Sequence, residues 1–315
     1  MVIMHGCQKD YTERFPEHTS WRIRTAMPTA RHNLGFVECN DRLYAIGGYN
    51  HTGLNTVEAY DPASDSWQTR KPMPTARGYL VTATVGNKIY AIGGINGKEA
   101  NNITYTNVTE EYDPVTDTWI TRAAFPAPKP SNTTIGNQFI TGTAMDNKIY
   151  IVLGNAGANS SFIYDPANDT WSNAAAPISK FSLRPLFSAC NNDNLYVTDG
   201  KDFLQYRPAK DEWNELPAAP VSRKAPSLAV YNNNIFIAGG YTPKNNNDFD
   251  LVTLKNVELY NPNTNEWTIS EPLNTKRHSA AALTCNNELY IVGGAEKKIN
   301  LSDSAITSLE SLKIN

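Results

Sequence analysis

The chain has 315 residues, 28 Lys and Arg against 31 Asp and Glu, a net charge of -3, and 40% hydrophobic residues. This balance gives no overall positive field, so nucleic-acid binding is not expected. The longest apolar runs, such as 43–46, have the length of ordinary strands, so membrane insertion is not expected. Because no Pro/Gly/Ser linker divides the chain, we expect an N-terminal extension at 1–18 and one domain at 19–315.

Six apolar runs, each closed by a glycine pair or its remnant, divide the chain into copies roughly 50 residues apart. The runs lie at 43–48, 89–94, 149–154, 195–200, 235–240 and 289–294. Each run predicts a buried strand that ends where the backbone needs positive φ or a close approach. An alternating stretch such as 35–39 precedes each run, and two more follow, around 57–60 and 67 in the first copy. Each copy therefore predicts four short antiparallel strands.

A second marker is a tyrosine followed seven residues later by a tryptophan. It occurs in five copies, at Tyr60/Trp67, Tyr112/Trp119, Tyr164/Trp171, Tyr206/Trp213 and Tyr260/Trp267. The sixth copy offers one more strand, expected at 305–310, and no such pair. Trp21 lies ten residues before Arg31, the same interval as that from Trp67 to Arg77, so Trp21 belongs to the sixth copy. The N-terminal strand is therefore predicted to pair with the C-terminal strand and close a ring without open edges.

These motifs resemble the Kelch repeat. The double glycine, the VEAYDP segment at 57–62, the Tyr to Trp spacing and the MPTAR segments at 27–31 and 73–77 carry the resemblance, which extends over residues 19–310. It implies an all-β fold, a six-bladed β-propeller with four antiparallel strands per blade, closed by the N-terminal strand around Trp21.

The repeat also separates scaffold residues from candidate site residues. A charged residue that recurs at one position in most copies is explained by blade construction, because buried charges must be matched. This interpretation covers Arg31, Arg77, Arg223 and Arg277 and the acids Glu58, Glu110 and Glu258. Cys39, Cys190 and Cys285 also share one repeat position, and equivalent positions on adjacent blades lie too far apart for a disulfide. We expect free thiols there.

The candidate site residues are those that depart from the repeat in two sets of loops. In Kelch propellers the link from the last strand to the next blade and the loop after the glycine pair open on one face, around the channel mouth, where ligands bind. The candidates on these loops are His32, Tyr49, Tyr79, Phe139, Arg184, Lys201, Lys224, Tyr241 and His278. The tyrosines and Phe139 offer rigid amphipathic surfaces. Arg184, Lys201 and Lys224 come from the neighbouring fourth and fifth copies and predict a cationic sector for an anionic ligand.

The third and fourth copies depart most from the repeat. Their glycine pairs have become Leu153-Gly154 and Asp199-Gly200, which makes this half of the ring our first choice for a site. The long loops at 95–107 and 241–256 are predicted to form walls or a lid over the same face.

Three functions remain open. The first is a non-enzymatic interaction propeller that binds an acidic peptide or protein, similar to the propellers of BTB-Kelch adaptor proteins. The second is a small-molecule enzyme resembling bacterial sialic-acid mutarotases, with Arg184 and Lys224 holding the carboxylate of an anionic sugar while a carboxyl group or a His acts as acid and base. The third is a carbohydrate-binding surface protein.

Motifs that would identify an enzyme are missing from the sequence. It has no nucleophile elbow, phosphate-binding loop or dinucleotide fingerprint. His32, His51 and His278 lack the short spacing of a metal site, so neither a metal nor a cofactor is expected. We favour a monomeric, non-enzymatic protein and leave catalytic activity open. Cytoplasmic localisation is favoured, with export the alternative if the N-terminus is a processed or truncated signal.

Overall fold

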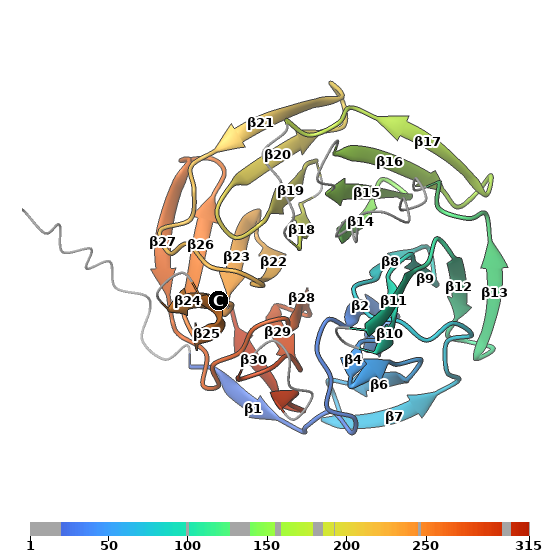
Figure 1. The fold of residues 1–315 in the computed structure, drawn as a ribbon, viewed down its shortest axis with the longest axis horizontal. Helices are drawn as coiled ribbons and strands as arrows, with labels where there is room; N and C mark the ends of the chain where they lie inside the picture. Colours follow the sequence, from blue (N-terminus) through green and yellow to red (C-terminus); the bar gives the residue numbers. More distant parts are fainter. Residues whose placement is uncertain are drawn as a thin grey trace, which may run out of the picture.

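The computed structural model describes residues 20–98, 101–126, 139–154, 159–178, 185–191, 193–244, 247–297 and 304–314. Within these residues, six four-stranded antiparallel sheets are arranged as blades around a central channel (Figure 1). The predictions of an all-β fold and of a six-bladed propeller are therefore confirmed. In the described part of the chain, no helix is long and apolar enough to cross a membrane.

The blades follow one another in chain order, and each runs from an innermost to an outermost strand. Blade 1 consists of β2 (Gly35–Cys39), β3 (Arg42–Ile46), β6 (Val57–Asp61) and β7 (Ser66–Arg70). Blade 2 consists of β8 (Val81–Val85), β9 (Lys88–Ile92), β12 (Thr109–Asp113) and β13 (Thr118–Arg122). Blade 3 consists of β14 (Phe139–Met145), β15 (Lys148–Gly154), β16 (Ser160–Asp165) and β17 (Thr170–Ala174).

The second half of the ring repeats this order. Blade 4 consists of β18 (Phe187–Cys190), β19 (Leu195–Thr198), β20 (Phe203–Arg207) and β21 (Glu212–Leu216). Blade 5 consists of β22 (Ser227–Tyr231), β23 (Asn234–Ala238), β26 (Val257–Asn261) and β27 (Glu266–Ser270). Blade 6 consists of β28 (Ala281–Cys285), β29 (Glu288–Val292), β30 (Leu309–Lys313) and β1 (Arg22–Arg24).

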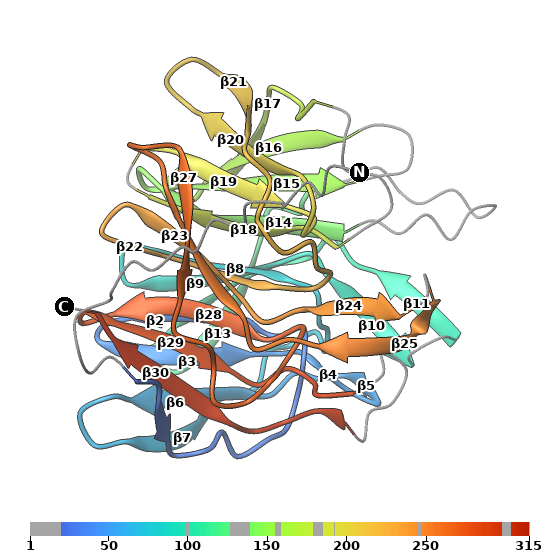
Figure 2. The ribbon, with the colours of Figure 1, turned by 90° about the vertical axis from the view of Figure 1, so that its left-hand side faces the viewer.

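Two further sheets project from one face of the ring (Figure 2). Blades 1 and 2 jointly build the first from β4 (Tyr49–Asn50), β5 (Thr52–Gly53), β10 (Ile95–Lys98) and β11 (Asn101–Tyr105). Blade 5 builds the second as a hairpin of β24 (Tyr241–Lys244) and β25 (Asn247–Thr253). The long loops after the glycine pairs of blades 2 and 5 thus form walls, as predicted, and they do so with β-hairpins.

The ring closes through the N-terminal strand, as predicted. β1 pairs antiparallel with β30, with Ile23 opposite Glu310. Trp21 is 5% exposed and donates its indole N–H to the carbonyl of Glu271 at 2.9 Å. The last strand lies at Leu309–Lys313 and not at 305–310 as expected, because Leu309 and Glu310 occupy the blade positions of Val57 and Glu58.

Apolar side chains fill the spaces between neighbouring blades. One cluster joins Val37 and Tyr44 of blade 1 to Ile89 and Tyr112 of blade 2, and Trp119 packs against it. The Trp119 indole N–H donates to the carbonyl of Lys71, in the link that leads from blade 1 to blade 2, at 3.0 Å. The repeated tyrosine and tryptophan therefore hold each blade to its predecessor.

The recurring charges are paired inside the blades. Arg31 Nη1 lies 2.7 Å from Glu58 Oε2, and Arg31 Nη2 donates to the Ala45 carbonyl at 3.0 Å. The same pairing joins Arg77 to Glu110, Arg223 to Glu258 and Arg277 to Glu310. These side chains are at most 2% exposed, which bears out their interpretation as scaffold and adds Glu310 to the set.

The glycine pairs allow neighbouring blades to approach closely. Gly47 and Gly48 have φ of 60° and 104°, and the Gly48 N–H donates to the Arg77 carbonyl at 3.0 Å. A Cβ atom on Gly47 would lie 2.4 Å from that carbonyl oxygen, so no other residue fits without a shift of the backbone.

The three described cysteines are free thiols, as predicted. Burial raises the pKa of both Cys39 and Cys285 to about 11, so these thiols are protonated and unreactive at neutral pH. Cys7 lies outside the described residues.

Candidate functional site: the channel mouth

The two predicted loop sets meet on one face of the ring. Isolated bridges join the residue after the repeated arginine to the residue after the glycine pair, at His32↔Tyr49, Gly78↔Ile95, Lys224↔Tyr241 and His278↔Ala295. In blade 1 the His32 N–H donates to the Tyr49 carbonyl at 3.1 Å, and the Tyr49 N–H donates back at 2.8 Å. These backbone bridges therefore place candidate residues of blades 1, 5 and 6 at one end of the channel.

A chain of backbone hydrogen bonds runs around this mouth. The Ser279 N–H donates to the Ala225 carbonyl at 2.9 Å, Asn33 to Ser279 at 2.8 Å, and Tyr79 to Asn33 at 2.9 Å. All four residues adopt the left-handed backbone conformation, with φ between 49° and 53°. That conformation costs roughly 1–2 kcal/mol for a non-glycine residue, so the inter-blade bonds hold a bulky tyrosine in a strained position at the mouth.

Aromatic side chains form a row across blades 1 to 3. The ring centroids of His32 and Tyr49 are 6.3 Å apart, those of Tyr49 and Tyr79 are 5.7 Å apart, and those of Tyr79 and Phe139 are also 5.7 Å apart. Tyr49 is 3% exposed and donates its hydroxyl to the Ile95 carbonyl, whereas Tyr79 and Phe139 are partly exposed. The row therefore ends in two aromatic rings accessible at the mouth.

The opposite side of the mouth carries His278 and Tyr241. Their ring centroids are 5.3 Å apart, and both side chains are buried. His278 Nε2 lies 2.9 Å from the Lys297 carbonyl oxygen, and Nδ1 lies 3.1 Å from Ser279 Oγ. Burial lowers the pKa of His278 to about 4, so the ring is neutral and supports the loop at neutral pH. The ligand contacts predicted for His32, Tyr49, Tyr241 and His278 stay predictions.

Two of the three predicted cations lie on this face. Lys201 is exposed on the short loop of blade 4, and Lys224 is partly buried on blade 5. Asp199 replaces the first glycine of blade 4 and accepts the N–H groups of Lys201 and Asp202, each at 2.9 Å. This departure from the repeat therefore builds a tight turn that presents Lys201. Arg184 lies outside the described residues.

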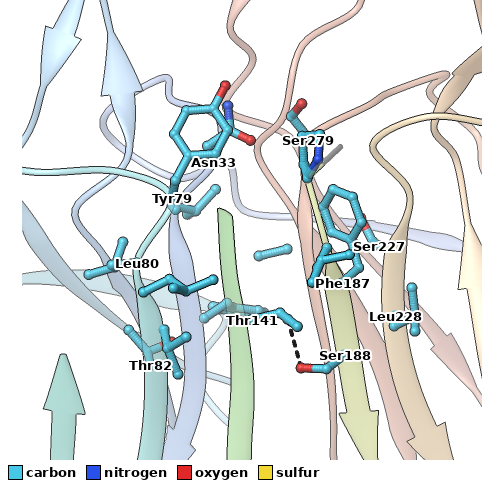
Figure 3. A pocket seen from close by; sticks show the side chains of 18 of the residues that line it. Asn33, Tyr79, Leu80, Thr82, Thr141, Phe187, Ser188, Ser227, Leu228 and Ser279 are labelled. Atoms are coloured by element: carbon cyan, nitrogen blue, oxygen red, sulfur yellow. Dashed lines mark hydrogen bonds between the residues drawn. The ribbon is translucent and has the colours of Figure 1, made fainter. Parts of the chain in front are cut away.

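A pocket of about 160 Å³ lies in the channel just inside the mouth (Figure 3). Its walls come from the innermost strands and the residues that precede them. Tyr79 and Phe139 are lining residues that the sequence predicted. Hydroxyl side chains that the sequence did not single out also line it, namely Thr82, Thr141, Ser188, Ser227 and Ser279. Among the described residues that line the pocket, none carries a charged side chain.

The described residues show no group of three His, Cys, Asp or Glu side chains that could hold a metal ion. The site is thus a mouth of aromatic, cationic and hydroxyl groups on a β-propeller.

The fold is a six-bladed β-propeller, and comparison of the sequence with family profiles gives the family. The profile described as "FKB95, Kelch-repeats domain" matches residues 7–216, and the profile described as "Kelch motif" matches residues 222–274. The chain belongs to the Kelch-repeat family.

Curated relatives share part of this chain. Beta-scruin of Limulus polyphemus is 25% identical over 209 residues, which cover 63% of this chain and 22% of the relative. Kelch repeat and BTB domain-containing protein 12 of Homo sapiens is 28% identical over 178 residues, covering 49% of this chain and 28% of the relative. Kelch-like protein 21 of Mus musculus is 32% identical over 108 residues, covering 34% of this chain and 17% of the relative. The match thus spans under a third of each relative.

A solved structure entitled "Structure of YjhT" has the same fold. It superposes with a TM-score of 0.71 and 17% sequence identity, covering 90% of this chain and 95% of that chain. At this level of identity the likeness concerns the fold alone.

Proposed function

We propose that this chain is a non-enzymatic interaction propeller that binds an acidic peptide segment of a partner protein across the channel mouth. Kelch-repeat propellers are typically protein-interaction modules. The observation that carries the proposal is the combination, on one face, of the accessible rings of Tyr79 and Phe139 with the cations Lys201 and Lys224.

The aromatic rings supply affinity in this proposal. Tyr and Phe bury a large area with few rotatable bonds, and such residues dominate the energy of binding surfaces. Tyr79 is fixed from below by the Asn33 hydrogen bond and from the sides by Tyr49 and Phe139. A rigid platform loses little entropy when a peptide binds.

The walls and cations supply orientation. The β24–β25 hairpin and the sheet of β4, β5, β10 and β11 rise beside the mouth, so an extended segment lies between them (Figure 2). Lys201 and Lys224 stand on the neighbouring blades 4 and 5, where they attract Asp and Glu side chains and raise the association rate.

The residues that line the pocket favour a binding function over the mutarotase reaction. Anomer exchange of an anionic sugar needs an acid–base pair and a cation for the carboxylate. The described residues that line the pocket include no Asp, Glu, His, Lys or Arg.

The test is a selection of random displayed peptides on the wild-type propeller and on a Lys201→Glu/Lys224→Glu variant. We expect peptides rich in Asp and Glu on the wild type, and binding weakened about tenfold by the reversal, because two rim charges change sign. The matched control is Lys148→Glu/Lys210→Glu, which makes the same charge change at two exposed lysines on the opposite face, one at the start of β15 and one in the turn before β21. Selected peptides without acidic residues, or an equal loss in the control, would contradict the proposal.

A further inference from the structure

The pocket inside the channel has a chemistry of its own, distinct from the mouth above it. Tyr79 and Ser279 lie at its upper end, and Thr82 and Ser188 lie at its lower end (Figure 3). A dry cavity of about 150 Å³ in another protein holds one benzene molecule. The volume of about 160 Å³ here is therefore enough to hold a single six-membered ring.

Two serines of the lining each keep one hydrogen-bonding group for a ligand: Ser188 keeps a donor and Ser227 keeps an acceptor. Thr141 donates its hydroxyl to Ser188 Oγ at 2.7 Å, so the Ser188 proton remains to be donated elsewhere. Ser227 donates to the Ala280 carbonyl at 2.9 Å, so the Ser227 oxygen keeps its lone pairs as acceptors. A hydroxyl group both accepts and donates, so a hydroxyl-bearing ligand satisfies both serines.

A third hydroxyl reaches the pocket because of a glycine on the neighbouring blade. A Cβ atom on Gly35 would lie 2.2 Å from Cγ2 of Thr82, so Gly35 makes the space in which the Thr82 side chain sits. Apolar groups alternate with these hydroxyls, since Leu80, Phe187 and Leu228 also line the pocket. The lining thus suits a ring with hydroxyls on its edge and C–H groups on its faces.

The lining also discriminates by charge. Burying a carboxylate without a cation or a set of donors is strongly unfavourable. Arg31 and Arg277, each two residues before a lining residue, are already paired with Glu58 and Glu310. None of the described lining residues carries a charged side chain, so these residues offer an anionic ring no cationic partner.

We infer that the channel is a binding site for a small neutral ring compound with several hydroxyl groups, a monosaccharide or a cyclic polyol, held by Ser188, Ser227 and Thr82. This site takes its ligand below the mouth, and it does not depend on the peptide proposed above it.

The test uses saturation-transfer NMR on the full chain with methyl β-D-glucopyranoside and myo-inositol as neutral rings. Methyl β-D-glucuronide is the matched anion, because it carries a carboxylate on the same ring. We expect transfer to at least one neutral ring and none to the glucuronide. Ser188→Ala and Ser227→Ala should each weaken binding about fivefold, the effect of losing one hydrogen bond.

Ser64→Ala is the matched control, because Ser64 Oγ pairs with Ser66 Oγ at 2.8 Å in an exposed turn away from the channel. It should leave binding unchanged, and the melting temperature of each variant verifies folding. No transfer to either neutral ring at the highest soluble concentration would overturn the inference. Equal binding of the glucuronide, or an equal loss in the control, would also overturn it. Peptide selection on the Ser188→Ala variant tests the mouth alone, so a failure of the channel site can be told apart from a failure of peptide binding.

Discussion

The pairing of Arg31 with Glu58 makes a quantitative prediction about the scaffold. Glu58→Leu leaves a guanidinium that is 0% exposed without its carboxylate, and breaks the 2.7 Å contact and the Thr29 hydroxyl bond to Glu58. Breaking a buried ion pair from one side costs about 3–5 kcal/mol. Arg31→Met likewise leaves the buried Glu58 carboxylate without its cationic partner, and we expect a similar loss in the free energy of unfolding.

The double variant separates the free energy of the ion pair from that of the other contacts made by the two side chains. Arg31→Met/Glu58→Leu replaces two buried charges with apolar side chains, a change that is close to neutral for the charges themselves. It still removes the hydrogen bond to the Ala45 carbonyl, which costs about 1–3 kcal/mol if that oxygen stays unsatisfied. The double variant should therefore lose much less stability than the two single variants combined, with a coupling of about 3 kcal/mol or more.

Urea unfolding, followed by tryptophan fluorescence and circular dichroism, measures these changes. The exposed pair Arg207 and Glu212, 3.5 Å apart and 40% and 44% exposed, is the control. Glu212→Leu should cost about 1 kcal/mol or less. Additive losses at Arg31 and Glu58, or a loss at Glu58 no larger than that at Glu212, would refute the reasoning.

Three further predictions concern the ring and its response to acid. Trp21→Ala should lower the free energy of unfolding by about 3–5 kcal/mol, because it empties a buried site at the closure, and an undiminished urea midpoint would count against ring closure. The hydrogen bond from Tyr206 lowers the pKa of Asp211, so this group stabilises the fold above its unfolded pKa of about 3.9 and loses that effect as pH falls through the folded pKa. Asp211→Asn, which copies Asn265 of blade 5, should therefore lose less stability in acid than the wild type, measured by melting temperature against pH. Burial lowers the pKa of His278 from 6.5 to about 4, so between these two pH values the unfolded chain binds a proton that the folded chain does not. Acidification from pH 6.5 to 4 should then cost the wild type about 3 kcal/mol that His278→Gln does not lose.

The sequence predicted the fold because its signals are local and repeated. The glycine pairs, the Tyr to Trp spacing and the recurring Arg and Glu each report a constraint within one blade or between two neighbours. Trp21 needed only its interval to Arg31 to be assigned to the last blade. The last strand was misplaced because it lacks the tyrosine and tryptophan that mark the others. The match of Leu309 and Glu310 to Val57 and Glu58 was the signal that identified it.

The site was predicted less completely, for a physical reason. Loop residues such as Tyr79 and Phe139 stood out because they depart from the repeat. Ser188 and Ser227 are small residues on innermost strands, and their role depends on the direction of hydrogen bonds across blades. No local pattern encodes that direction. The other blades place several residue types at these two strand positions, among them Gly, Thr, Ala and Phe, so the repeat gave no constant residue against which the serines stood out.

Hydrogen exchange on the propeller, with and without a selected acidic peptide, tests the central claim most directly. The account predicts added protection in the backbone at 79–82, 139–142 and 199–203 and around Lys224, all at the mouth. The turns on the opposite face, such as the one just before Lys148, should be unchanged. Protection confined to the outermost strands or to those opposite turns would contradict binding at the channel mouth.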